Sequence, residues 1–132
     1  MVFTSASAAV RLPAADLERA RAWYRDRLGL DPAEERDGGL RYLLGGTEFC
    51  LFESSGASTG AFTQMAITVD DLDSTMRALR ARGVEFERFE GLTDEDAVAA
   101  IDGNYPSKGT GERAAWFRDS EGNLVGLGQP VG

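Results

Sequence analysis

The feature that most restricts how this chain can fold is an internal repeat. Residues 10–17 (Val-Arg-Leu-Pro-Ala-Ala-Asp-Leu) and residues 65–72 (Met-Ala-Ile-Thr-Val-Asp-Asp-Leu) share an apolar pattern at a constant offset of 55. In each copy an alternating apolar stretch predicts a half-buried strand, and the Asp that follows stands where a helix N-cap is expected. The chain therefore repeats one unit of strand, cap and helix.

The residues after each cap predict an amphipathic helix followed by short strands. Each helix has apolar residues at spacings of three and four and ends at a glycine, Gly29 or Gly83. The apolar residues are Leu17, Ala20, Tyr24 and Leu28 in the first helix and Leu72, Met76 and Leu79 in the second. The strands expected after the helices are Asp31–Glu35, Leu40–Leu44, Thr47–Phe52, Val84–Phe89, Arg113–Phe117 and Leu124–Leu127.

Each half is thus predicted to be a βαβββ module in an α+β fold. We expect one domain over residues 1–132, with a first module over about 1–55, a Ser- and Gly-rich linker over about 54–60 and a second module over about 61–132. The second half contains an apparent insertion, Gly91–Glu112, in which Thr93–Asp96 is expected to cap a short helix through Ala97–Ile101. Such a segment is either a binding loop or a surface loop.

Composition excludes several classes of partner. The chain has 22 acidic and 14 basic residues, a net charge of −8, and no cluster of Lys or Arg, so we expect neither nucleic acid nor membrane as a partner. No signal peptide or membrane span is recognisable, which favours the cytoplasm. The chain has no histidine and one cysteine, Cys50, so the commonest metal ligand is absent and no internal disulfide can form.

Three segments resemble the vicinal-oxygen-chelate superfamily, which includes glyoxalases, bleomycin resistance proteins and extradiol dioxygenases. Residues 10–30 are similar to its opening module, residues 116–127 to its closing hairpin, and residues 65–72 to the start of its second module. The resemblance implies two tandem βαβββ modules that form a curved mixed sheet around a cavity. It also implies a homodimer, and in some members the partner subunit completes the cavity.

In metal-dependent members of that superfamily, four side chains bind one divalent ion. Carried over by position, the first-strand ligands correspond to Ala9 and Gln64, and the last-strand ligand of the second module corresponds to Gly126. The fourth position is either Glu48 or Cys50. Ala and Gly have no side-chain donor, so we expect these positions to be vacant and no divalent metal to serve as a cofactor.

Strand alternation predicts which side chains line the cavity instead. Trp116 and Phe52 are candidates for stacking on a flat ligand, and Arg11, Gln64 and Glu48 for polar contacts. The full set of candidate ligand-binding residues is Trp116, Phe52, Arg11, Gln64, Glu48, Cys50, Thr68 and Tyr105. Each has a simpler interpretation as well: Trp116 as a packed core residue, Arg11 as a solvated cation and Cys50 as a small buried filler.

These residues favour one function and leave two others open. The favoured hypothesis is a binding protein that sequesters a small apolar or aromatic natural product or drug without a metal and without catalytic residues. The second is a divergent lyase, isomerase or dioxygenase-like enzyme, with Glu48 as a lone general base. The third is an interaction module that binds no small ligand.

Overall fold

The computed structural model describes residues 2–53, 57–103 and 109–132 of the chain. In these residues eight strands form two four-stranded sheets, accompanied by two α-helices and a π-helical turn, η1. The elements of the first module are β1 (Val10–Pro13), α1 (Leu17–Trp23), η1 (Tyr24–Leu28), β2 (Glu34–Arg36), β3 (Gly39–Leu44) and β4 (Thr47–Phe52). Those of the second are β5 (Met65–Thr68), α2 (Leu72–Ala81), β6 (Ala99–Asp102), β7 (Gly111–Arg118) and β8 (Leu124–Val131).

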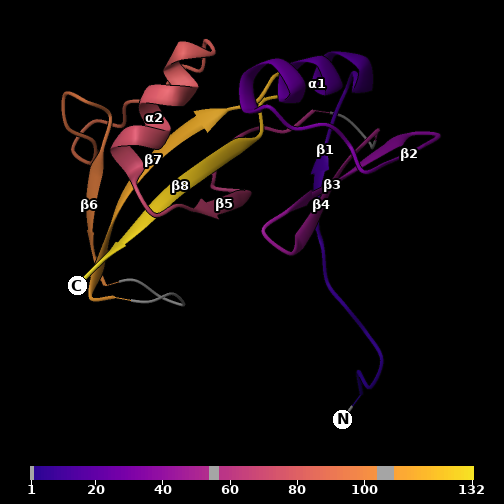
Figure 1. The fold of residues 1–132 in the computed structure, drawn as a ribbon, viewed down its shortest axis with the longest axis horizontal. Coiled ribbons are helices and arrows are strands. Elements are labelled where there is room, and N and C mark those ends of the chain that lie inside the picture. The colour runs from indigo at the N-terminus through magenta and orange to yellow at the C-terminus, as the bar shows by residue number, and fades with distance from the viewer. Residues whose placement is uncertain (1, 54–56, 104–108) are drawn as a thin grey trace.

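The two sheets have the same topology. Their strand orders are β1-β4-β3-β2 and β5-β8-β7-β6. In each sheet the first strand of the module runs parallel to the last, and the remaining pairs are antiparallel. Figure 1 shows the sheets side by side, with β1 and β5 at the facing edges. The predicted α+β fold of two βαβββ modules is confirmed.

Both helices begin where the sequence predicts. Asp16 accepts a hydrogen bond from the backbone N–H of Arg19 at 3.0 Å, and Asp71 accepts one from Ser74 at 3.1 Å. From Asp16 to Gly29 is 13 positions, whereas from Asp71 to Gly83 is 12. The π-helical turn η1 accommodates the additional residue of the first helix, because a π turn is a one-residue expansion of an α-helix.

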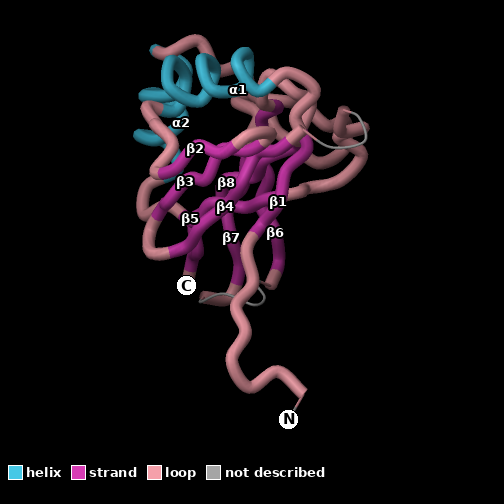
Figure 2. Tube along the Cα trace, turned by 90° about the vertical axis from the view of Figure 1, so that its right-hand side faces the viewer, coloured by secondary structure: helices cyan, strands magenta, loops and turns pink. Residues whose placement is uncertain are grey.

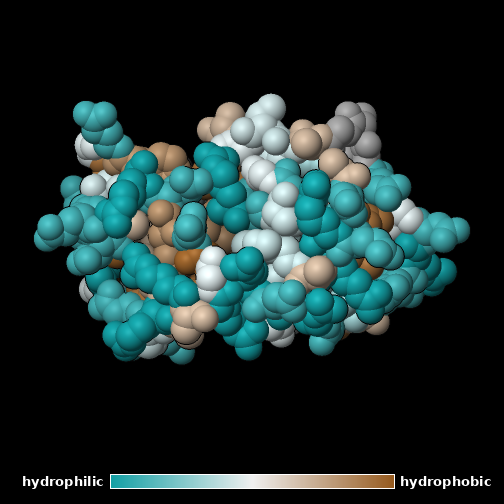
Figure 3. All heavy atoms as spheres, turned by 90° about the horizontal axis from the view of Figure 1, so that it is seen from above, coloured by the Kyte–Doolittle hydropathy of each residue, from teal (hydrophilic) through white to brown (hydrophobic). Residues whose placement is uncertain are grey.

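The helices cover one side of the sheets, and both modules share the core beneath them. In Figures 1 and 2 the helices lie above the strands, and the N-terminal segment extends away from them. Seen from the helix side, the surface in Figure 3 is mostly hydrophilic with small apolar areas. The largest fully buried side chains come from both modules and include Tyr24, Tyr42, Phe117, Leu12 and Val125. No helix in residues 2–53, 57–103 and 109–132 is long and apolar enough to cross a membrane.

Two predicted elements of the second module are wrong. Val84–Phe89 is not a strand and forms a single bridge, between Phe86 and Phe117. The helix expected through Ala97–Ile101 is replaced by strand β6. Asp94, expected to cap a helix, instead accepts hydrogen bonds from the backbone of Asp96 and Val98, and Ala97 has a positive φ of 67°. This conformation is incompatible with a right-handed helix.

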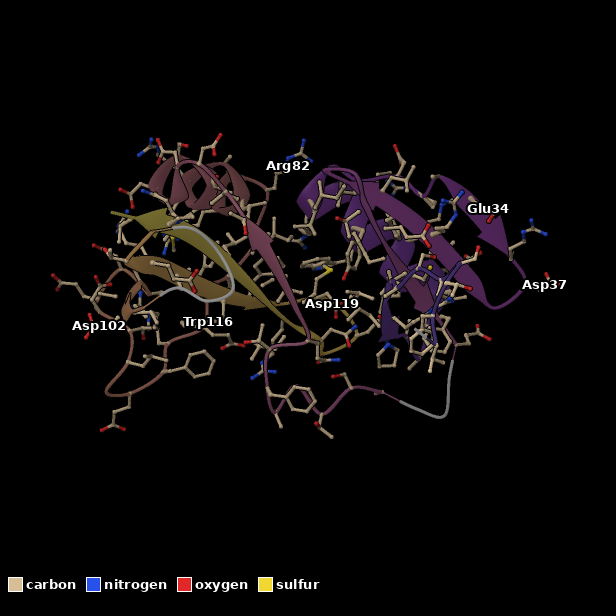
Figure 4. The ribbon with its side chains drawn as sticks, turned by 90° about the horizontal axis from the view of Figure 1, so that it is seen from below. Glu34, Asp37, Arg82, Asp102, Trp116 and Asp119 are labelled. Carbon is tan, nitrogen blue, oxygen red and sulfur yellow. The ribbon has the colours of Figure 1, made fainter. Side chains whose placement is uncertain are left out.

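A buried polar network joins the modules at the turn between β7 and β8. The Tyr24 hydroxyl of the first module donates to Asp119 at 2.7 Å, and Arg19 donates to Glu121 at 2.8 Å. Glu121 also accepts from the backbone N–H of Asp16 at 2.9 Å, at the start of α1. Figure 4 shows Asp119 between the two halves of the molecule. The network therefore fixes the first helix against the second sheet.

Candidate functional site

The candidate site residues lie on the faces of the sheets that point away from the helices, which we call the open faces. Along β4 the buried Phe49 and Leu51 pack into the core, so Glu48, Cys50 and Phe52 lie on the opposite face. The same alternation places Arg11 on the open face of the first sheet and Ala66, Thr68 and Trp116 on that of the second. These are the faces that the sequence predicted.

On the first open face, four side chains form one row across the strands. Arg11 in β1 is the register partner of Cys50 in β4, Cys50 is the partner of Arg41 in β3, and Arg41 is the partner of Glu34 in β2. We call Arg11, Cys50 and Arg41 the arginine row. The row has a small side chain at its centre and a guanidinium on each side.

The equivalent row of the second sheet has different chemistry. Ala66 in β5 is the register partner of Gly126 in β8, which is the partner of Trp116 in β7. We call these three residues the tryptophan row. The Trp116 indole donates to the Thr63 hydroxyl at 3.1 Å, and its ring centroid lies 5.6 Å from that of Phe89 in an edge-to-face arrangement. Trp116 is partly exposed, and its ring lies close to Gly126, where an added Cβ would be 3.2 Å from Nε1.

Ion pairs neutralise most of the charge near the arginine row. Arg41 contacts Glu48 at 3.1 Å and Glu34 at 3.4 Å, and Arg36 contacts Glu34 at 3.0 Å. The hydrogen bond that Arg41 donates to Glu48 raises the pKa of Arg41. Arg11 forms no ion pair within the described ranges, and the remaining positions, 1, 54–56 and 104–108, include no acidic residue. The open face of the first sheet therefore has one uncompensated cation.

Two cavities hold the predicted site residues in different combinations. A cavity of about 260 Å³ on the first open face is lined by Arg11, Glu34, Arg36, Gly39, Leu40, Arg41, Glu48, Cys50 and Phe52. A cavity of about 340 Å³ between the modules is lined by Val10, Leu44, Gly45, Thr47, Glu48, Phe49, Met65, Ala66, Ile67 and Thr68. Glu48 belongs to both. The structure thus brings together Arg11, Glu48, Cys50 and Phe52, and separately Glu48 and Thr68.

The other predicted residues are placed apart from these cavities. Trp116 lies on the second sheet, and Figure 4 shows it in the opposite half of the molecule from Glu34. Gln64 is held by the polar network, because its Nε2 donates to Asn123 at 2.9 Å and its Oε1 accepts from the backbone of Leu124 at 3.1 Å. Tyr105 lies outside the described residues. Within one chain the predicted set is therefore divided between two sheets.

The strand register also shows which of Glu48 and Cys50 is the counterpart of Gly126 in the first module. Gly126 pairs with Ala66, and the repeat equivalent of Ala66, at an offset of 55, is Arg11. Arg11 pairs with Cys50, so Cys50, not Glu48, is the counterpart of Gly126. Glu48 forms an ion pair with Arg41 at 3.1 Å, so it is not the lone carboxylate that a single general base would require.

Sequence reasoning missed several residues of these faces. Arg41 and Glu34 set the charge of the first face, and Thr63 holds the Trp116 ring. The position of Arg41 could have been found, because it alternates with the buried Leu40 and Tyr42. Its pairing with Glu48 depends on the register of the hairpin, and the contact of Phe89 depends on a segment that forms no strand.

The fold and the sequence together define a known class of protein. A family model described as the Glyoxalase/Bleomycin resistance protein/Dioxygenase superfamily matches residues 7–127. The chain belongs to this superfamily, as the resemblance in its repeat and closing hairpin indicated. No curated protein sequence matches the chain significantly.

Solved structures of the same fold cover most of the chain. A glyoxalase/bleomycin resistance protein/dioxygenase from Alicyclobacillus acidocaldarius is 16% identical with a TM-score of 0.70, covering 96% of this chain and 92% of its own. The fosfomycin resistance protein FosX from Listeria monocytogenes, complexed with Mn(II) and sulfate, is 16% identical with a TM-score of 0.66, covering 96% and 90%. A bleomycin-binding protein complexed with bleomycin is 23% identical with a TM-score of 0.65, covering 95% and 98%. At these identities the similarity establishes the fold alone.

The expectation that this site has no divalent metal as a cofactor is corrected by these relatives. FosX has the same fold and is complexed with Mn(II), so vacant positions inferred from the sequence do not justify excluding a metal. The side chains of the two open faces nevertheless do not fit a divalent metal site. Within residues 2–53, 57–103 and 109–132, no three His, Cys, Asp or Glu residues are grouped so that they could hold an ion.

Proposed function

We propose that this chain binds a small, largely apolar or aromatic molecule on the open faces of its sheets. The observation that carries the proposal is the tryptophan row: a partly exposed indole, held in place by Thr63 and Phe89, lies over a glycine on a sheet face that the core does not use. A held aromatic ring beside small residues is suited to stacking on a flat ligand.

The arginine row supports the same proposal from the first module. Its cavity of about 260 Å³ combines the apolar ring of Phe52 with a few charged groups, as ligand sites commonly do. Because the two rows belong to different sheets of one chain, we propose that a second copy completes the site. The first open face of one copy would then oppose the second open face of the other, in a homodimer with two equivalent sites.

Tryptophan fluorescence offers a direct test, because the chain has only two tryptophans. Trp116 lies on the open face, whereas Trp23 stacks on Phe117 at 6.0 Å on the helix side. Bleomycin and the neutral quencher 4-nitrobenzyl alcohol are titrated into the wild type, Trp116→Phe and Trp23→Phe. We expect saturable quenching in the wild type and in Trp23→Phe, and its loss in Trp116→Phe. Quenching that survives in Trp116→Phe, or no saturable binding of either probe, would refute the proposal.

The dimer is tested separately, by sedimentation equilibrium with and without the bound probe. We expect a dimer of about twice the 14.2 kDa chain mass and one probe per chain. A monomer that binds one probe with unchanged affinity would remove the second copy from the proposal and leave the binding function intact.

The similarity to Mn(II)-bound FosX favours one alternative, a divergent metal-dependent enzyme of the same superfamily. Titration with Mn(II), monitored by the electron paramagnetic resonance signal of the free ion, distinguishes the binding protein from the metal-dependent enzyme. Tight stoichiometric binding of Mn(II) would favour the enzyme, and the positions to examine first would be Cys50 and Glu48.

A further inference from the structure

We propose that the ligand is an aromatic carboxylate, with its ring on Trp116 of one copy and its carboxylate on Arg11 of the other. This inference rests on the proposed function and adds the charge of the ligand to it. It follows from a difference between the two rows, one of which offers an aromatic face and the other an unneutralised cation.

Arg11 is the arginine of the first open face that is available to an anion. Arg41 is shared between two carboxylates, and Arg36 is paired with Glu34. Arg11 has no carboxylate within ion-pair distance in the described part of the chain, its side chain is exposed, and it lines the same cavity as Phe52. A planar guanidinium matches a carboxylate with two parallel hydrogen bonds.

The small residue at the centre of the row provides space for the anion. Cys50 lies between Arg11 and Arg41, and neighbouring strands are about 4.8 Å apart. The two arginine backbones are therefore separated by about two strand spacings, or roughly 10 Å. A carboxylate above the short Cys50 side chain can then reach the Arg11 guanidinium without meeting a large side chain.

The net charge of the whole chain does not oppose this assignment. The chain carries −8, but charges on its surface are screened over about 8 Å at physiological salt. On the first open face, Arg11, Arg36 and Arg41 outnumber Glu34 and Glu48 by one positive charge. A ligand in contact with this face experiences mainly that local excess.

The test compares two probes that differ in charge and share a ring. Calorimetric titration of 4-nitrobenzoate and 4-nitrobenzyl alcohol is carried out on the wild type, Arg11→Gln and Arg25→Gln. Arg25 is the matched control, because it lies in η1 outside both cavities, its side chain is 56% exposed and it forms an ion pair with Asp26. Thermal unfolding confirms that each variant is folded.

We expect the wild type to bind the carboxylate about tenfold more tightly than the alcohol, a difference of about 1.4 kcal/mol. Arg11→Gln should remove this preference and leave the affinity for the alcohol unchanged, while Arg25→Gln should retain it. Equal wild-type affinities, an equal loss in both arginine variants, or a loss of both probes in Arg11→Gln would overturn the inference and leave the binding function standing. Failure of the folded wild type to bind either probe would overturn the proposed function as well.

Discussion

The two modules of this chain share a strand order and a capped helix, but they differ at the turn that closes each sheet. Between β3 and β4 the turn is Gly45-Gly46, which is exposed and has positive φ angles of 58° and 80°. Between β7 and β8 the turn is Asp119–Asn123, in which Asp119, Glu121 and Asn123 are buried. One turn is a minimal hairpin connection, and the other is a folded polar cluster.

This difference determines how well the space between the modules is filled. The longer turn extends to the first module, where its side chains bond Tyr24, Arg19 and the backbone of Asp16. The shorter turn leaves a cavity of about 340 Å³ beside β5, lined in part by Leu44, Gly45 and Thr47. The modules thus meet at two junctions. The turn Asp119–Asn123 holds the modules together, and we call it the closed junction. The junction at Gly45-Gly46 stays open and adjoins the proposed site.

The strongest test of the closed junction is Asp119→Ala. Asp119 accepts from the Tyr24 hydroxyl at 2.7 Å, from the backbone of Glu121 at 2.8 Å, and from Asn123 through both its backbone at 2.9 Å and its side chain at 2.8 Å. Removing the carboxylate leaves several buried donors without an acceptor, so we expect the free energy of unfolding to fall by about 3–4 kcal/mol.

Urea unfolding measures this loss, with Asp102→Ala as the control because Asp102 is an exposed acid at the end of β6. The control should change stability by less than about 0.5 kcal/mol. If the free energy of unfolding falls by the same small amount in both variants, the polar turn does not hold the modules together. The two junctions would then contribute equally little to stability.

The next test places the same leucine at the centre of each row. At Gly126 even a Cβ would lie 3.2 Å from Trp116 Nε1 and 3.4 Å from Thr63 Cγ2, so Gly126→Leu should displace the indole at a cost of about 1–3 kcal/mol. Cys50→Leu projects into an open cavity of about 260 Å³ and should cost less than about 1 kcal/mol. Thermal unfolding and the Trp116 emission spectrum measure both, and equal effects would contradict the asymmetry of the two rows.

Much of this arrangement could be predicted from the sequence, because it depends on local periodicity. The repeat gave both helix caps, Asp16 and Asp71, and alternation gave the open face of each strand. The division of the site between two sheets could not be predicted. Alternation specifies which face of a strand a side chain lies on, but it does not specify how the two sheets are placed relative to each other. The ion pair of Arg41 with Glu48 depends on hairpin register. The turn at Ala97 depends on Asp94, which accepts from the backbone N–H groups of Asp96 and Val98 instead of capping a helix.

The closed junction should also weaken at low pH. Burial acts to raise the pKa of Glu121, but hydrogen bonds from Arg19, the Asp16 backbone and Ser120 outweigh it and lower the pKa from 4.5 to about 2. A lowered pKa in the folded state means that the contribution to stability is complete above pH 4.5 and is lost as the pH falls toward 2. Because Arg19 is 55% exposed and screened by solvent, we expect the ionised Glu121 to contribute about 1–2 kcal/mol to the free energy of unfolding.

Glu121→Gln tests this dependence. The wild type should be more stable than the variant at pH 6, and the difference should shrink steadily between about pH 4.5 and pH 2. Ser120→Ala removes a neighbouring hydroxyl that donates to the same carboxylate at 2.8 Å and serves as a milder control. A stability difference that is constant over this pH range would show that the Glu121 charge does not act at the junction.

The smallest expected effect concerns a contact in which the modules are nearly symmetric. Arg27, in η1, donates to the carbonyls of Arg82 at 3.3 Å and Gly83 at 2.9 Å, and Arg82 donates to the Asp26 carbonyl at 3.2 Å. Arg27 and Arg82 are related by the repeat offset of 55, and each places a cation at the C-terminal end of the other helix.

Because these contacts are exposed, Arg27→Ala and Arg82→Ala should each lower Tm by about 1–3 °C. Arg27→Ala should lower it slightly more, since Arg27 makes two hydrogen bonds and Arg82 one. The double variant provides the sharper measurement: the guanidinium groups bond to backbone carbonyls and not to each other, so the two losses should add. A clear departure from additivity would mean that the two helix ends respond as one unit, and that the modules are coupled at the helices as well as at the polar turn.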